Sequence, residues 1–270
     1  MIVYPNAKIN LGLRVLSKRP DGYHNIETVM IPVPARDILE VIPAMDGQFR
    51  FGSSGTDAGV PAERNLVVRA FRILERFTPV DPVHIHLHKQ LPLGAGLGGG
   101  SSDAAFLLKA VNSLQALGLD DDALESLALE VGSDVPFFIR NIPVVALGRG
   151  EVMDPFPVDL SGYYLVVAMP DFSVSTKEAY AHIQPDPGRD PLSGLLKQPL
   201  PLWKSLLCND FETYVFSKFP ESVKIKKALY SSGALYAQMS GSGAAFFGVF
   251  EGEPELKGLE ECKVVFSQKL

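Results

Sequence analysis

The stretch Pro92-Leu93-Gly94-Ala95-Gly96-Leu97-Gly98-Gly99-Gly100-Ser101-Ser102-Asp103-Ala104-Ala105 decides how this 270-residue chain is interpreted. Five glycines fall within the seven positions from Gly94 to Gly100. Glycines leave backbone N–H groups unobstructed and permit positive φ, as a concave anion-binding loop requires. An amphipathic helix predicted over residues 101–117 follows directly, so the positive end of its dipole faces the loop. The stretch therefore predicts a phosphate-binding loop, with the Ser101 and Ser102 hydroxyls available to a phosphate oxygen or Mg²⁺.

Other glycine-rich motifs fit the surrounding sequence less well. A flexible linker is not usually joined to a strongly amphipathic helix. Gly94, Gly96 and Gly99 match the dinucleotide fingerprint G-x-G-x-x-G, but that motif needs a following helix and then a strand that ends in an acidic residue. Here a second helix, predicted over 121–131, follows the first. A Walker A loop needs a lysine, and none lies within this loop.

Working outward to the whole chain, composition and charge narrow the class of protein. Hydrophobic residues make up 46% and charged residues 21%, which is ordinary for a soluble globular protein. The net charge of −6 argues against general nucleic-acid binding. Cys208 and Cys262 are far apart and form no metal-binding or redox motif. No leader peptide and no apolar run of membrane-spanning length is found, so we expect a cytoplasmic protein without a membrane partner.

The order of predicted elements favours an α+β fold, because helices and strands do not alternate strictly as in a doubly wound sheet. A Pro- and Gly-bearing stretch near residues 154–162 predicts a boundary between domains 1–157 and 158–270. The Pro-rich stretch 184–201 is predicted to be loop. Strands are predicted at 1–16, 36–43, 47–52, 83–89, 163–169, 234–239, 244–250 and 263–267, and helices at 65–77, 101–117, 121–131, 203–217 and 221–232.

Three further motifs carry polar groups into apolar surroundings. Lys8 and Asn10 stand two positions apart in an apolar strand, so both side chains share one face, either as edge residues or as functional groups. Asp134, within Gly-Ser-Asp-Val-Pro-Phe-Phe, is either a helix cap or a functional acid. The segment Ser240-Gly241-Ser242-Gly243-Ala244 is a hairpin turn that could also bring backbone groups close to a ligand.

Two more motifs involve histidine. Asp21-Gly22-Tyr23-His24 predicts a tight turn that presents an aromatic ring and an imidazole. His84, His86 and His88 alternate and therefore share one strand face. With no acidic or cysteine partner nearby in sequence, a solvated face is a better interpretation of these three histidines than a metal site.

Together and in this order, the motifs around Lys8, Gly94–Ser102 and Ser240–Ala244 resemble those of the GHMP kinase superfamily, which includes galactokinase, homoserine kinase, mevalonate kinase and phosphomevalonate kinase. Four sequences make the chain most similar to the kinases of that superfamily that phosphorylate 4-diphosphocytidyl-2-C-methyl-D-erythritol. These are Pro-Asn-Ala-Lys-Ile-Asn-Leu, Asp-Gly-Tyr-His, the glycine-rich loop with its Leu-Pro start, and Gly-Ser-Asp-Val-Pro-Phe-Phe. Asn209-Asp210-Phe211-Glu212 also resembles the family's Asn-Asp-Leu-Glu, with Phe for Leu.

The resemblance implies roles for particular residues. Lys8 and Asp134 match the catalytic pair, in which Asp134 accepts the proton of the substrate's 2-hydroxyl and Lys8 stabilises negative charge. Asn10, Tyr23, His24, Lys89 and Tyr180 match positions that bind the cytidine diphosphate-methylerythritol substrate. Ser102 is the candidate Mg²⁺ contact, and we find no counterpart of the additional Mg²⁺-binding glutamate of related kinases. The ATP-binding residues implied are Pro92, Leu93, Gly94, Ala95, Gly96, Leu97, Gly98, Gly99, Gly100, Ser101 and Ser102.

The resemblance also implies an architecture and an activity. We expect an N-terminal kinase-type domain, a C-terminal ferredoxin-like domain, and a monomer or weak homodimer. The expected reaction is ATP-dependent, uses Mg²⁺, and belongs to non-mevalonate isoprenoid biosynthesis. Alternatives are a sister kinase of the homoserine or phosphomevalonate type, a non-catalytic nucleotide-binding regulator on the same fold, and a Rossmann oxidoreductase.

Overall fold

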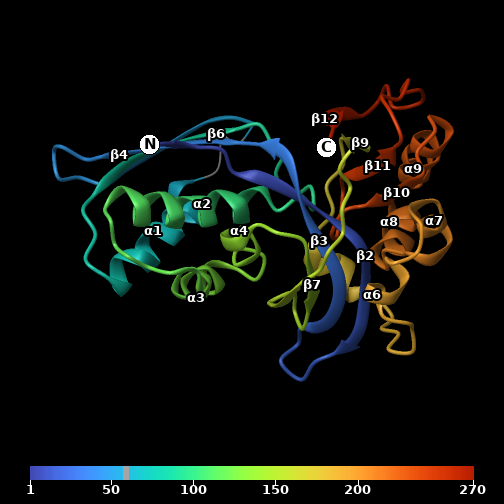
Figure 1. The fold of residues 1–270 in the computed structure, drawn as a ribbon, viewed down its shortest axis with the longest axis horizontal. Coiled ribbons are helices and arrows are strands. Elements are labelled where there is room, and N and C mark those ends of the chain that lie inside the picture. Colours follow the sequence, from blue (N-terminus) through green and yellow to red (C-terminus); the bar gives the residue numbers. More distant parts are fainter. Residues whose placement is uncertain (57–60) are drawn as a thin grey trace. The chain divides into compact units, whose positions relative to one another are not determined.

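The protein has an α+β fold, seen here in a computed structural model that describes residues 1–56 and 61–270 (Figure 1). Contacts within the chain divide it into two compact units. The first consists of residues 1–7, 34–93 and 98–142, and the second of residues 8–33, 94–97 and 143–270. This division is interleaved, whereas the sequence predicts two consecutive domains. Two long strands, β2 (Asn6–Lys18) and β3 (His24–Arg36), have residues in both units. No local pattern in the sequence predicts this sharing of strands.

A four-stranded sheet in the order β1-β4-β6-β5 forms one layer of the first unit. β4 is antiparallel to β1 and β6, and β5 is parallel to β6. In β6 the apolar side chains Val83, Ile85 and Leu87 are buried and alternate with the histidines, as the sequence predicts. The strands are β1 (Ile2–Val3), β4 (Ile38–Pro43), β5 (Arg50–Gly55) and β6 (Val83–Lys89).

Helices α1 to α4 form the other layer of this unit, and α2 packs against α1, α3, α4 and strand β4 (Figure 1). The side chain of Asn65 caps α1 by accepting the Val67 N–H at 2.9 Å, and Asp120 caps α3 by accepting the Ala123 N–H at the same distance. The helices are α1 (Leu66–Phe77), α2 (Gly99–Leu114), α3 (Asp121–Val131) and α4 (Phe137–Arg140), with a 3₁₀ turn at Ala62–Arg64.

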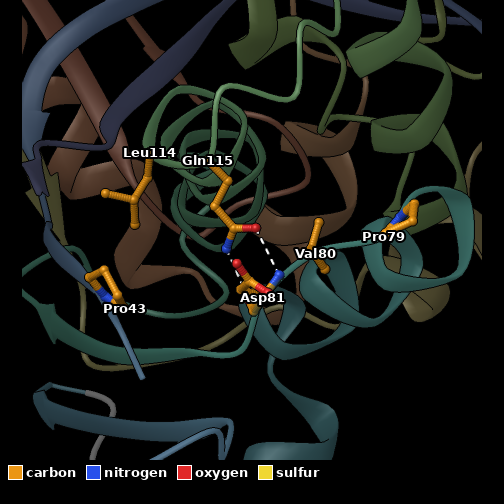
Figure 2. A pocket seen from close by; sticks show the side chains of 6 residues that line it. All are labelled: Pro43, Pro79, Val80, Asp81, Leu114 and Gln115. Atoms are coloured by element: carbon orange, nitrogen blue, oxygen red, sulfur yellow. Dashed lines mark hydrogen bonds between the residues drawn. The ribbon is translucent and has the colours of Figure 1, made fainter. Parts of the chain in front are cut away.

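The end of α2 is fastened to the segment that precedes β6 (Figure 2). The side-chain amide of Gln115 accepts the Asp81 N–H and donates to the Asp81 carbonyl, both at 2.8 Å. Pro43, Val80 and Leu114 line a small pocket around this pair of hydrogen bonds. These two hydrogen bonds join the C-terminal end of α2 to the start of β6 within the first unit.

The second unit contains two further sheets. In one, the order is β2-β3-β7-β8, with β7 antiparallel to both β3 and β8. In the other, β9, β10, β11 and β12 are antiparallel in the order β10-β11-β9-β12, which is the strand order of a ferredoxin-like sheet. A ferredoxin-like fold usually has a helix between its last two strands, but residues 251–262 form turns here. The strands are β7 (Val144–Leu147), β8 (Val152–Pro155), β9 (Tyr164–Met169), β10 (Tyr236–Met239), β11 (Phe246–Phe250) and β12 (Lys263–Lys269).

Helices α8 and α9 pack beside β10 and β11 and enclose the core of the second unit (Figure 1). Leu13, Val15 and Ile26, from the long hairpin, are buried in the same cluster as Phe211 and Phe246. Residues near the N-terminus therefore complete a core that is otherwise built from residues beyond 165. The helices are α5 (Thr176–Ala181), α6 (Leu192–Leu195), α7 (Trp203–Leu206), α8 (Phe211–Lys218) and α9 (Glu221–Ser231), with a 3₁₀ turn at Leu200–Leu202.

The Pro-rich stretch 184–201 is mostly loop, as predicted, but it also contains α6. It is tied to the hairpin of β2 and β3 by hydrogen bonds. The Asp186 N–H donates to the Val15 carbonyl at 3.0 Å, and the Leu192 N–H donates to the Glu27 carboxylate at 2.9 Å. These contacts give the stretch a fixed course that its composition does not predict.

Candidate active site

The glycine-rich loop has the conformation that its composition predicts. Gly94, Gly96 and Gly98 have φ values of 63°, 74° and 71°, in the left-handed region that other residues rarely adopt. Gly98 is also the N-terminal cap of α2, so the loop leads directly into the first turn of that helix. The first N–H groups of a helix have no partner within it and favour an anion. The loop therefore has the backbone geometry of a phosphate site.

The turn at residues 240–243 supports this loop from the second unit's own sheet. The Ser240 hydroxyl donates to the Gly96 carbonyl at 2.9 Å, and the Ala245 N–H donates to the Ala95 carbonyl at 3.1 Å. A Cβ atom added to Gly96 would lie 2.0 Å from the Ser240 carbonyl oxygen. Gly96 is thus required by close approach as well as by its φ value. The Gly-Ser turn is therefore a hairpin turn, as predicted, and it also contacts the glycine-rich loop.

Asn209 holds the same turn in place. Its side-chain amide donates to the carbonyls of Met239 and Gly241, both at 2.8 Å, and accepts the Phe211 N–H at 3.0 Å. Asn209 is 2% exposed, so these bonds are shielded from water. The resemblance in the Asn209–Glu212 stretch therefore has a structural basis, because this asparagine positions the turn beneath the loop.

Strand β2 brings Lys8 and Asn10 to one face, as their spacing predicts. The Lys8 ammonium donates to the Asn10 side-chain oxygen at 2.5 Å, and the Asn10 amide donates to the Thr28 hydroxyl at 3.0 Å. The Lys8 N–H donates to the Leu97 carbonyl at 2.9 Å and so joins the strand to the glycine loop. Both side chains are buried, Lys8 at 3% exposure. This burial does not fit an exposed edge position, and the predicted catalytic role of Lys8 stays a prediction.

Lys89 occupies a buried ionic cluster in the first unit. Its ammonium lies 2.5 Å from the Asp37 carboxylate and 2.7 Å from that of Asp103, the latter in the first turns of α2. The other oxygen of Asp37 accepts the N–H groups of Gln90 and Leu91 at 2.6 and 2.9 Å. The cluster joins the end of β6, the residue that precedes β4, and α2. In this arrangement the Lys89 ammonium contacts protein carboxylates, and its predicted role in binding substrate stays a prediction.

The cluster combines two carboxylates with one ammonium, and this imbalance affects its pKa values. Burial raises the pKa of Asp103 to about 7; the Asp37 charge acts in the same direction, and Lys89 opposes it. Burial by itself would lower the pKa of Lys89, but attraction to Asp103 and Asp37 outweighs it, so the pKa is raised. Lys89 therefore stays charged, and Asp103 titrates near neutral pH.

Two buried polar atoms at the start of α2 have no hydrogen-bond partner within residues 1–56 and 61–270. They are the Ser102 hydroxyl oxygen and the second carboxylate oxygen of Asp103. A buried polar atom without a partner is costly, so it indicates a strained site or a ligand. A hydroxyl oxygen next to a phosphate loop has the chemistry that Mg²⁺ prefers, so the residues fit the predicted Mg²⁺ contact at Ser102.

Asp134 belongs to the first unit, in the turn between α3 and α4, and its side chain is partly buried. Gly132 ends α3, and the Val135 N–H donates to the Gly132 carbonyl at 3.1 Å, which closes the turn. The N-terminal cap position of α4 is occupied by Pro136, which provides no side-chain cap. The alternative interpretation of Asp134 as a simple helix cap is therefore not supported by the position of α4.

The residues predicted to bind the nucleotide end of the substrate come together in the second unit. The tight turn predicted at Asp21–His24 connects β2 and β3, and Tyr23 on it is 56% exposed. The rings of His24 and Tyr180 stack with centroids 4.9 Å apart, and Tyr180 makes an edge contact with Phe211 at 4.8 Å. Burial, together with the charge of Lys18, lowers the pKa of His24, so a neutral ring is favoured. The structure thus brings into contact His24 and Tyr180, two predicted substrate-binding residues that are 156 positions apart in the sequence (180 − 24).

The alternating histidines have partners on neighbouring strands and turns. The Ser54 hydroxyl lies within hydrogen-bond distance of His86 at 2.9 Å and His88 at 3.0 Å, and His84 lies 3.1 Å from Asp46. In the described part of the chain, no group of three or more His, Cys, Asp or Glu side chains could hold a metal ion. No helix of that part is long and apolar enough to cross a bilayer.

Several residues of the site escape sequence reasoning. Asp37 and Thr28 contact predicted residues but carry no recognisable motif of their own. Asp103 lies within the glycine-rich loop motif, but its ion pair with Lys89 was not predicted. Arg149, over the Tyr23 ring at 5.1 Å, was also not predicted. The only available signal for Arg149 is its position between two glycines, which is typical of a tight turn.

Two protein families match parts of the sequence. The family of GHMP kinases N terminal domains matches residues 65–141, and the family of GHMP kinases C terminal domains matches residues 192–261. The chain belongs to the GHMP kinase family. The two matches lie on opposite sides of residue 157, but neither reaches it, so the predicted domain boundary stays a prediction.

Within that family, the chain is similar over nearly its full length to proteins named 4-diphosphocytidyl-2-C-methyl-D-erythritol kinase. The protein from Parabacteroides distasonis is 49% identical over 93% of this chain and 92% of its own length. The protein from Cytophaga hutchinsonii is also 49% identical, over 94% of both chains. The protein from Bacteroides fragilis is 46% identical over 100% of both chains.

Solved structures support the same fold. A crystal structure of a 4-(cytidine 5′-diphospho)-2C-methyl-D-erythritol kinase matches with a TM-score of 0.79 and 35% identity, over 94% of this chain and 91% of that one. A homoserine kinase from Cytophaga hutchinsonii matches with a TM-score of 0.65 and 22% identity, over 92% of this chain and 85% of that one. The homoserine kinase likeness concerns the fold alone.

Proposed function

We propose that this protein transfers the γ-phosphoryl group of ATP to the 2-hydroxyl of 4-diphosphocytidyl-2-C-methyl-D-erythritol, giving the 2-phosphate and ADP. The observation that carries the proposal is the identity of 46–49%, over 92% or more of each chain, to kinases named for that substrate. The reaction would serve non-mevalonate isoprenoid biosynthesis. Two free cysteines support a cytoplasmic location, and we expect a monomer or weak homodimer.

The glycine loop would bind the phosphates of ATP. Its glycines have the positive φ values that a concave anion-binding loop requires, and the first turn of α2 adds the helix dipole. No lysine within the loop is needed, because backbone N–H groups and the helix dipole provide the favourable field. Mg²⁺, held together with ATP near the Ser102 hydroxyl, would neutralise charge on the phosphates.

Lys8 and Asp134 would carry the proton transfer and charge stabilisation. In this proposal the 2-hydroxyl oxygen attacks the γ-phosphorus, its proton passes to the Asp134 carboxylate, and ADP leaves. The Lys8 ammonium would stabilise negative charge that builds on the transferred phosphoryl group. Asn10 supports this role because it orients the Lys8 ammonium through a 2.5 Å hydrogen bond. The predicted substrate residues Tyr23, His24 and Tyr180 would bind the cytidine end by stacking, as aromatic rings do with bases.

The test is ADP release, coupled to NADH oxidation, with Mg-ATP and 4-diphosphocytidyl-2-C-methyl-D-erythritol. We expect release that depends on this substrate, and none with homoserine, mevalonate or phosphomevalonate. Release with one of those substrates and not with the cytidyl compound would contradict the proposed substrate and favour a sister kinase.

A further inference from the structure

Tyr23 is an exposed ring that one arginine holds in place. The Arg149 guanidinium lies 5.1 Å from the centre of the Tyr23 ring, within the range of a cation–π interaction. More than half of the Tyr23 surface is exposed, whereas the Arg149 side chain is 33% exposed. The Arg149 contact therefore restrains a ring that is largely exposed.

Arg149 lies in the tight turn of the hairpin between β7 and β8, and the conformation of this turn is closely defined. Gly148 and Gly150 on either side have φ values of 69° and 107°, which other residues would resist. The Gly148 carbonyl accepts the Ile26 N–H at 2.7 Å, and this bond fixes the turn against β3. A Cβ atom added to Gly148 would lie 2.8 Å from a carboxylate oxygen of Glu151, so that carboxylate packs closely inside the turn.

Glu151 in turn fixes the arginine. Its carboxylate accepts the Arg149 N–H and pairs with the Arg149 side chain at 3.3 Å. Partial burial alone would raise the pKa of Glu151, but hydrogen bonds from the Glu151 and Arg149 N–H groups outweigh it and lower the pKa. Glu151 therefore stays ionised across the neutral range and holds the guanidinium side chain.

The turn that carries Tyr23 is equally well defined on its backbone. The Arg19 N–H donates to the Tyr23 carbonyl at 2.8 Å, and the Tyr23 N–H donates to the Asp21 carboxylate at 3.1 Å. The Arg19 side chain also pairs with Asp21 at 3.0 Å. With the backbone fixed from one side, the orientation of the ring depends on the Arg149 contact.

We infer that Arg149 is a positioning residue for the nucleotide end of the substrate: stacked on Tyr23, it holds the ring in the orientation that stacks on the cytosine base. This inference rests on the proposed function. A guanidinium lies flat on an aromatic ring and loses little freedom there, so it suits this task better than a lysine. A ring held in its binding orientation lowers the entropy lost when the ligand binds.

The test is the kinetics of Arg149→Met, with Arg149→Lys as the conservative variant. An exposed cation–π contact of about 0.5–1 kcal/mol corresponds to an affinity change of about two- to fivefold. We expect KM for the cytidyl substrate to rise by about that factor in Arg149→Met, with KM for ATP and kcat unchanged, and Arg149→Lys to recover part of the loss. Arg72→Met is the matched control, because Arg72 makes the same kind of contact, at 4.4 Å, with the ring of Phe49, which is not a predicted ligand residue.

A double-mutant cycle with Tyr23→Leu shows whether Arg149 acts through the ring. We expect Arg149→Met to add nothing in the Tyr23→Leu background. An equal loss in both backgrounds, or an unchanged KM in Arg149→Met, would overturn the inference while the wild type still phosphorylates the cytidyl substrate. If the wild type neither phosphorylates that substrate nor binds CDP in calorimetry, the proposed function and the inference fail together.

Discussion

The ammonium of Lys89 lies between two buried carboxylates, and replacing it would leave both without their cation. We expect Lys89→Met to lower the free energy of unfolding by about 3–5 kcal/mol, because breaking a buried ion pair leaves uncompensated charge. Urea unfolding measures the change. Lys257→Met is the control, since the Lys257–Glu255 pair is largely exposed and should matter little. A variant as stable as the wild type but with a raised substrate KM would instead support direct substrate binding by Lys89.

The same cluster predicts a dependence of stability on pH. The Asp103 pKa is about 7 in the folded protein, against about 3.9 in an unfolded chain. The folded state therefore binds more protons between these values, and the stability contribution of Asp103 is present below about pH 4 and lost as pH rises towards 7. Asp103→Asn should flatten the fall in unfolding free energy between pH 5 and 7.5, measured by urea unfolding. Parallel pH profiles of the two proteins would contradict this assignment.

Asp134 is the residue on which the proposed chemistry depends most. We expect Asp134→Asn to lower kcat by at least about 100-fold, since a positioned general base typically contributes 10²–10⁴-fold. ATP affinity, measured by calorimetry, should stay within about twofold because the phosphate loop is intact. Retained turnover in Asp134→Asn would remove this residue from the role of base.

At the scale of elements, the glycine loop packs against the 240–243 turn. We therefore expect substitutions at different glycines of the loop to have different effects. Gly96→Ala would place a methyl group 2.0 Å from the Ser240 carbonyl oxygen and force the loop to move. Gly94→Ala is the matched control, because its φ is also positive but nothing lies within 4 Å of an added Cβ. We expect Gly96→Ala to raise KM for ATP at least tenfold. Gly94→Ala should raise it less, because its free-energy cost is only that of an alanine with positive φ, about 1–2 kcal/mol. Equal effects of the two changes on KM would show that the turn does not restrict the loop.

Elements also differ in how well local rules anticipate them. α3 begins and ends where the sequence predicts, because Asp120 and Gly132 are local start and stop signals. α2 begins two residues earlier than predicted, with Gly98 as its cap, and ends at Leu114, three residues earlier than predicted. The single helix predicted at 203–217 is divided into α7 and α8. Asn209, between them, is not helical, and its side chain instead binds the carbonyls of Met239 and Gly241 at the 240–243 turn.

At the scale of the whole molecule, the interleaved units predict that the C-terminal half does not fold alone. A fragment of residues 158–270 would lack β2, β3, β7 and β8, and also the core residues Leu13, Val15 and Ile26. We expect no cooperative thermal transition for this fragment in circular dichroism, and binding of a hydrophobic dye to its exposed core. Mixing with residues 1–157 is the companion experiment, and recovery of a transition is expected only in the mixture. A cooperative transition in the isolated fragment would support the sequential boundary at 157/158.

The sequence alone determined those features that depend on neighbouring residues. The backbone conformation of the glycine loop and the shared face of Lys8 and Asn10 follow from glycine's φ freedom and the two-residue period of a strand. The α+β class and the family resemblance follow from the order of such local signals. Each of these requires information from only a few consecutive positions.

Only the tertiary structure decided the features that join distant segments. Strands β3, β7 and β8 were not predicted. β3 pairs with β7 across more than a hundred residues, from Thr28 to Ala146, and strand formation depends on such partners. β8 is a four-residue strand that forms only as the hairpin partner of β7. The partners of Lys89, the support of Gly96 by Ser240, the stacking of His24 on Tyr180 and the contact of Arg149 with Tyr23 are likewise long-range. Buried charges and exposed rings acquire their roles from the groups that surround them in space, and no local pattern in the chain specifies those neighbours.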